Sequence, residues 1–147
     1  MAVATIEEGL VTFLLADAAI TALVGTRIGP WGAQGEDTPR ISWTLISTED
    51  ESMVRLSSDE PSVRIQIDCW ASGMAGARAL AKLVKNSRGG QASSVPRLKE
   101  YQGNMGGAWV QSCRMENELT EATDPFDASE TPLCRVIQDY IIGFKEP

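Results

Sequence analysis

The sequence of 147 residues contains no histidine. Histidine is the side chain that most often acts as a general base near neutral pH, activates a nucleophilic serine or cysteine, and binds transition metals. Its absence strongly disfavours catalysis. We therefore expect a protein that is not an enzyme and that holds no cofactor and no metal.

Cysteine is also scarce. Cys69, Cys113 and Cys134 lie far apart, within segments that have the pattern of strands, and no two of them form a CxxC pair. An odd number of isolated cysteines in apolar strands is typical of free thiols buried in a core and kept in a reducing compartment.

Positive charge and long apolar runs are limited as well. Thirteen basic residues against 20 acidic ones give a net charge of −7, which argues against a nucleic-acid binder with the usual basic surface. The longest mainly apolar run, residues 9–25, carries Asp17 and is too short for a membrane span. Glu7 and Glu8 precede it, where a signal peptide would have basic residues. We expect a cytosolic protein without membrane contact.

What is present suits one domain, residues 1–147, with one core. Helical spacing of apolar residues predicts helices over 5–15, over a short stretch between Asp17 and Gly25, and over 72–88 with Ser72 as the N-cap. Alternation predicts strands within 27–39 and over 40–48, 62–70, 108–119 and 133–144.

The predicted order is α-α-β-β-β-α-β-β. It indicates an α+β fold with a mainly antiparallel sheet of four to five strands and helices on one face. Residues 91–106 are expected to be irregular. In the strand at 108–119, strict alternation would place Trp109 and Cys113 on the same side of the sheet.

The strand at 62–70 has one apolar side and one polar side. The polar side carries Arg64, Gln66, Asp68 and Trp70. Arg64 and Asp68 point the same way but stand roughly 13 Å apart along the strand, so each is expected to have a cross-strand partner rather than the other. Two interpretations remain open: this side faces another subunit or lines a ring, or it is a solvent-facing flank with a chance tryptophan.

More than half of the acidic residues lie in two connections, near 49–61 and 116–131, which we expect to be flexible. The acidic residues singled out there as candidates for contact with other assembly components are Glu49, Asp50, Glu51, Asp59, Glu60, Glu121, Asp124 and Asp127. The helix at 72–88 instead carries a basic stripe of Arg78, Lys82 and Lys85. Either the connections are simply solvated, or the acidic tip of one copy contacts the basic helix of the next, head to tail.

Two stretches carry a resemblance to a known family. They are ADAAITALVGTRIGPWGAQGEDTPRISW, residues 16–43, and RIQIDCWASGMAGARALAKLV, residues 64–84. In these patterns of small and apolar residues the chain resembles the tail-completion or tail-terminator proteins of long-tailed bacteriophages, which join tail to head. The resemblance covers mainly residues 8–88.

The resemblance implies a virion protein at the head-proximal end of the tail, present in the host cytoplasm during assembly. It implies a homo-oligomeric ring, a hexamer, that caps the tail tube protein and offers a surface to the head connector or head-completion protein. DNA would pass through the lumen without specific binding, and the net negative charge suits such a channel. The alternatives are another head–tail connector subunit, or a small-molecule-binding or enzymatic α+β domain that uses the Asp68 face.

Overall fold

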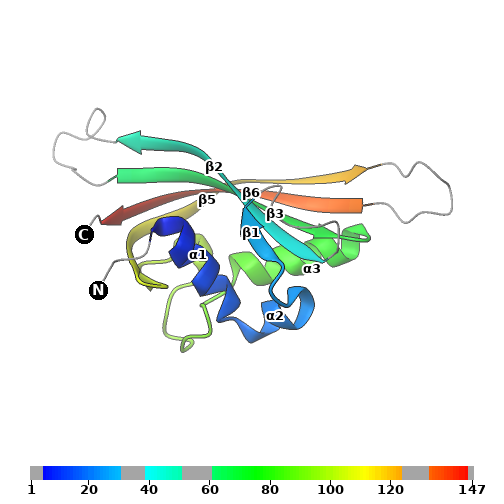
Figure 1. Ribbon diagram of the computed structural model, residues 1–147, viewed down its shortest axis with the longest axis horizontal. Helices are drawn as coiled ribbons and strands as arrows, with labels where there is room; N and C mark the ends of the chain where they lie inside the picture. The colour runs from blue at the N-terminus through cyan, green and yellow to red at the C-terminus, as the bar shows by residue number, and fades with distance from the viewer. Residues whose placement is uncertain (1–4, 31–38, 51–60, 124–132, 146–147) are drawn as a thin grey trace.

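Three α-helices cover one face of a six-stranded sheet in the computed structural model, and the other face carries no helix in the part of the chain described (Figure 1). The structure describes residues 5–30, 39–50, 61–123 and 133–145. The expected α+β class, with helices on one side of the sheet, is confirmed.

The helices begin where the sequence provides caps, with one exception. Helix α1, Ile6–Leu15, has the capping box that Thr5 and Glu8 predict. Helix α2, Ala18–Val24, begins at Asp17, whose carboxylate accepts hydrogen bonds from the first turn. Helix α3, Met74–Lys85, begins after Gly73 without a side-chain cap, so the prediction of Ser72 as its N-cap is wrong.

The strand order in the sheet is β1-β2-β3-β6-β5-β4. The four long strands are β2, Arg40–Asp50; β3, Pro61–Ala71; β5, Ala108–Thr123; and β6, Leu133–Lys145. They pair antiparallel throughout. The edge strands, β1 at Ile28–Pro30 and β4 at Gly103–Met105, have three residues each, and β1 pairs parallel to β2.

The sixth strand corrects the prediction of four to five. Strand β4 lies within 91–106, which was expected to be irregular; a 3₁₀ turn, Leu98–Glu100, precedes it. Three residues of Gly-Asn-Met show no alternation that a sequence pattern could detect. The glycine-rich segment is nevertheless part of the fold, because helix α1 packs closely against β4 at Gly9.

The two long hairpins extend in opposite directions from the helices (Figure 1). In the strand register, Ser62 of β3 lies beside Gly143 of β6, and Ala71 lies beside Cys134. Strands β3 and β5 therefore run the same way on either side of β6. The sequence left this crossover open. The structure shows that the β2–β3 connection and the β5–β6 connection leave the sheet at opposite ends.

Strand β5 departs from strict alternation. Its register with β6 shifts between Val110 and Ser112, so Val110 and Cys113 both face the core while Trp109 points away and is 52% exposed. The expectation that Trp109 and Cys113 share a side is wrong because a β-bulge inserts one residue between them. The strand also continues to Thr123, so residues 116–123 of the predicted acidic connection belong to the sheet.

The core lies between the sheet and the helices. It contains the apolar side of β3, as predicted, and the side of β6 that carries Val136, Tyr140 and Ile142. All three cysteines are buried and free, which confirms the expectation of free thiols in the core. Among the described residues, no helix combines the length and apolar character needed to cross a bilayer.

Candidate functional site

The polar side of β3 lies on the outer face of the sheet, the face away from the helices. Its neighbours are set by strand register. Trp70 lies between Arg40 of β2 and Arg135 of β6, and Asp68 lies between Ser42 and Ile137. The residues predicted from one strand are therefore completed by residues from both neighbouring strands.

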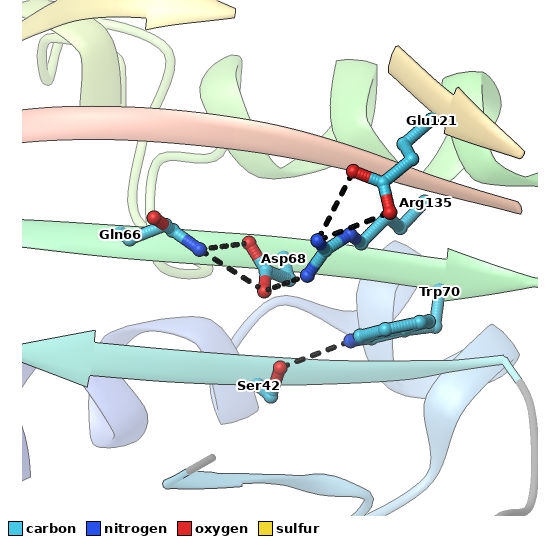
Figure 2. A network of polar contacts seen from close by, with 6 residues as sticks. All are labelled: Ser42, Gln66, Asp68, Trp70, Glu121 and Arg135. Carbon is cyan, nitrogen blue, oxygen red and sulfur yellow. Dashed lines mark hydrogen bonds and ion pairs between the residues drawn. The ribbon is translucent and has the colours of Figure 1, made fainter. Parts of the chain in front are cut away.

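Asp68 is held by a chain of polar contacts that crosses three strands (Figure 2). Gln66 Nε2 donates to Asp68 Oδ1 at 3.0 Å, and Arg135 Nη1 lies 3.2 Å from Oδ2. The other terminal nitrogen of Arg135, Nη2, lies 3.1 Å from a carboxylate oxygen of Glu121 on β5. The expected cross-strand partner of Asp68 is thus Arg135. Arg64 is not part of this network. The strand register places it between Ser47 of β2 and Ile141 of β6.

The Asp68 side chain is 1% exposed although it stands on the outer face. Burial removes water from the carboxylate and raises its pKa above the ordinary value. The hydrogen bond from Gln66 and the positive charge of Arg135 act in the opposite direction, and Asp139 adds a further raising effect. Removal from water is the largest of these effects.

Trp70 is fixed on the same face by contacts of two kinds. Its indole N–H donates to Ser42 Oγ at 3.0 Å (Figure 2). The guanidinium carbon of Arg40 lies 4.6 Å from the ring centroid and that of Arg135 lies 5.0 Å from it, both within cation–π range. Trp70 and Arg135 thus belong to one rigid cluster with Asp68.

A buried, paired carboxylate suits a structural role better than catalysis. A general base must reach the proton that it removes from a substrate, and Asp68 has its oxygens directed at Gln66 and Arg135. Among the described residues, no group of three or more His, Cys, Asp or Glu side chains is placed to hold a metal ion. The face offers a preorganised aromatic and charged surface.

The basic stripe of α3 borders a groove of about 310 Å³. Arg78, Lys82 and Lys85 line its helical side, and Glu118 of β5 lines the opposite side. Lys85 Nζ lies 3.2 Å from Glu118, so one of the three cations already has an acidic partner within the subunit. The three basic residues are brought together, as predicted, but apart from the Asp68 cluster.

The acidic candidates fall in three places. Glu121 lies on β5 and binds Arg135. Glu49 and Asp50 form the end of β2. Glu51, Asp59, Glu60, Asp124 and Asp127 lie outside the described residues.

Sequence reasoning missed Arg40, Ser42 and Arg135 as members of the cluster. Arg135 occupies a polar position in the alternation of its strand, but only the strand order places it beside Trp70.

Comparison with known proteins now places the chain in a class. A family model described as "Tail completion protein gp17" matches residues 8–96, which include most of α1, helices α2 and α3, and strands β1 to β3. The chain belongs to this family. It is accordingly a structural tail protein and a component of a phage-type virion.

A solved structure shares the fold. A chain of the "Virion of native gene transfer agent (GTA) particle" superposes with a TM-score of 0.67 at 16% identity, and the match covers 93% of this chain and 92% of that one. It therefore includes β5 and β6, beyond the family match. Among curated proteins, no sequence matches this chain.

Proposed function

We propose that this chain forms a homohexameric ring that caps the finished tail tube, ends its polymerisation and offers the joining surface to the head connector. The observation that carries the proposal is the opposite direction of the two long hairpins. A subunit built in this way can contact one component at each end, the tube on one side and the connector on the other. Membership of the tail completion family supports the same role.

The proposed ring depends on contacts between copies, and charge suggests one of them. The α3 groove has three basic side chains and one acidic one, in a chain whose net charge is −7. An acidic hairpin end of a neighbouring copy would find complementary charge there. The double variant Arg78→Glu with Lys82→Glu should therefore weaken self-association. Lys99→Glu in the 3₁₀ turn reverses a charge in the same sense outside the groove, and it is the control for Lys82→Glu alone.

DNA would pass through the centre of the ring without specific binding. A net negative chain repels phosphates, so the genome would slide through rather than be held. Filter binding at physiological salt should show no measurable affinity for duplex DNA. Binding that persists at that salt concentration would contradict this part of the proposal.

The direct test uses tails that lack this protein. Purified wild-type chain added to such tails should cap one end with a ring in negative-stain images, stop further growth of the tube, and allow heads to join. Tubes that keep growing and heads that stay separate after addition would contradict the proposed role. A ring at the tube end without head joining would favour a terminator that does not itself contact the connector.

A further inference from the structure

At each edge of the sheet, a short strand pairs with only part of the outer edge of a long strand. Strand β1 pairs with Ile41 to Trp43 of β2, and strand β4 pairs with Ala108 to Val110 of β5. Within 5–30, 39–50, 61–123 and 133–145, no strand pairs with the outer edge of β2 from residue 44 to 50, or with that of β5 from 112 to 123. Such edges present rows of backbone N–H and C=O groups that can pair with another chain.

Exposed apolar side chains gather on these two strands. Among the described residues, the exposed large hydrophobic side chains are Leu15, Leu23, Leu45, Ile46, Trp109 and Leu119. Leu45 and Ile46 lie on β2 beyond the part that β1 covers, and Leu119 lies on β5 beyond the part that β4 covers. Their exposed fractions are 41%, 48% and 54%. Apolar residues beside free edges are a feature of strands that receive a partner.

An apolar groove lies beside the free edge of β2, on the helix side of the sheet. It has a volume of about 550 Å³, and Val11, Ile28, Pro30, Trp43 and Leu45 contribute to its lining. The indole N–H of Trp43 is buried and has no hydrogen-bond partner among the described residues. A strand added to β2 beyond β1 would direct every second side chain toward this groove.

The directions of the strands fit pairing between copies. Strands β2, β3, β6 and β5 alternate in direction, so β2 and β5 run in opposite senses. When a second copy is placed beside the first with its helices on the same face, its β2 comes antiparallel to β5 of the first. The alternation of the sheet then continues across the boundary between subunits.

We propose that copies of this chain join head to tail by main-chain pairing, in which the free edge of β5 adds antiparallel to the free edge of β2 in the next copy. This inference rests on the proposed ring and names its contact. Because the two edges differ, each copy uses one and offers the other, which is the arrangement that closes into a ring. Strand β1 covers the start of β2 and strand β4 covers the start of β5, and these two starts lie at opposite ends of the sheet. The free segments can therefore pair only if neighbouring copies are staggered, so that the strands tilt as in a closed barrel.

Pairing of β5 with a second β5 is the competing arrangement. It would place the acidic side chains of two identical strands, Glu116, Glu118 and Glu121, along one ribbon, and like charges across strands are destabilising. It would also leave β2 unpaired and stop at a dimer. The free edge of β2 is uncharged from Thr44 to Thr48 and carries acidic residues only at its end, Glu49 and Asp50, so most of it meets the acidic edge of β5 without repulsion.

The test uses two single-cysteine additions, Ile46→Cys and Leu119→Cys, because the three native thiols are buried. The variants are mixed, assembled on tails that lack the protein, and treated with a short bismaleimide that tolerates small differences in register. We expect cross-linked dimers in the mixture and none with either variant alone. Dimers with Leu119→Cys alone would overturn the proposal in favour of β5–β5 pairing.

The same samples separate this inference from the proposed function. Rings at the tube end without cross-links would leave the ring in place and overturn the edge pairing. Absence of any ring with wild-type protein would overturn the proposed function itself.

A second variant gives an independent measurement. Leu119→Lys should weaken self-association roughly tenfold or more, because a charge replaces apolar surface at the contact. Leu23→Lys on α2, which is exposed to a similar degree, is the matched control and should leave association unchanged. Equal effects of the two substitutions would contradict the proposal. Circular dichroism of each variant confirms that it is folded.

Discussion

Arg135 Nη1 lies 3.2 Å from Oδ2 of Asp68, whose side chain is 1% exposed. The same guanidinium also contacts Glu121 and Trp70. Arg135 and Asp68 are 67 positions apart in the sequence and belong to neighbouring strands. Their contact fixes the outer face of β3 as one rigid surface. The energetic consequences of this contact differ for its two members.

Loss of the arginine should cost more than loss of the acid. Arg135→Gln leaves a buried carboxylate with Gln66 as its main donor and with Asp139 nearby, and an uncompensated buried charge costs about 3 kcal/mol or more. Asp68→Asn leaves Arg135 paired with Glu121, so the expected cost is about 1 kcal/mol. Urea unfolding of the two variants measures both values.

The matched control for that comparison is Arg114→Gln. Arg114 is 65% exposed and forms a surface ion pair with Glu116 on the same strand. Its loss should change the free energy of unfolding by less than about 1 kcal/mol. A cost for Arg135→Gln no larger than that of the control would show that the buried pair does not stabilise the fold.

The raised pKa of Asp68 predicts a particular pH dependence. A carboxyl whose pKa is higher in the folded state binds its proton more tightly there than in the unfolded chain. Its unfavourable contribution is therefore full above the raised pKa and is relieved as the pH falls through that value toward the ordinary carboxyl range. The unfolding free energy of the wild type, relative to Asp68→Asn, should increase as the pH is lowered from neutrality.

Denaturant titrations of both proteins over a pH series measure this difference. If the unfolding free energy of the wild type relative to Asp68→Asn instead decreases as the pH is lowered, Arg135 lowers the pKa of Asp68 more than burial raises it. Parallel curves would show that folding does not change the pKa.

Gly9 provides a test of the packing of α1 against β4. A Cβ at this position would lie against the carbonyl oxygen of Met105, far inside van der Waals contact, so Gly9→Ala should destabilise the protein by about 1–3 kcal/mol. Gly76→Ala in α3 is the same change in another helix, where the new Cβ would stand 3.2 Å from Ala71 Cβ. Its cost should be smaller, since alanine also favours the helix.

Thermal denaturation of the two glycine variants compares them directly. Equal midpoints for Gly9→Ala and Gly76→Ala would contradict the close approach of α1 and β4.

The three thiols should be unreactive in the folded protein. Burial raises the pKa of Cys113 to about 12 and raises that of Cys69 further, and the reactive species is the thiolate. A colourimetric thiol reagent at neutral pH should therefore react with the native chain only as fast as it unfolds, and with three thiols per chain in urea. The Ile46→Cys variant, with its exposed added thiol, supplies the positive control. Rapid reaction of the folded wild-type chain, which lacks the added thiol, would contradict the burial of the three cysteines.

How far the sequence predicts the fold depends on the regularity of each strand. Alternation correctly assigns the apolar side of β3 to the core, because β3 keeps its period along the whole strand. It fails in β5, where a bulge near Gln111 exposes Trp109, and it misses β4, which has three residues. Short edge strands and bulges are determined by tertiary contacts and leave little local signal.

The candidate site shows the same limit. The sequence indicates that Asp68 needs a cross-strand partner, because the spacing excludes Arg64. The identity of that partner depends on β6, rather than β5, lying beside β3, and sequence periodicity does not contain strand order. The segment around Glu121 was expected to be a connection, but its contact with Arg135 makes it part of the sheet.

Cryo-electron microscopy of intact virions that contain this chain tests the central claim most directly. The account predicts a ring of copies between the tail tube and the head connector, with β5 of each subunit continuing into β2 of the next and DNA density in the open centre. A map with the chain absent from this junction, or present there as isolated subunits without contact to one another, would contradict it.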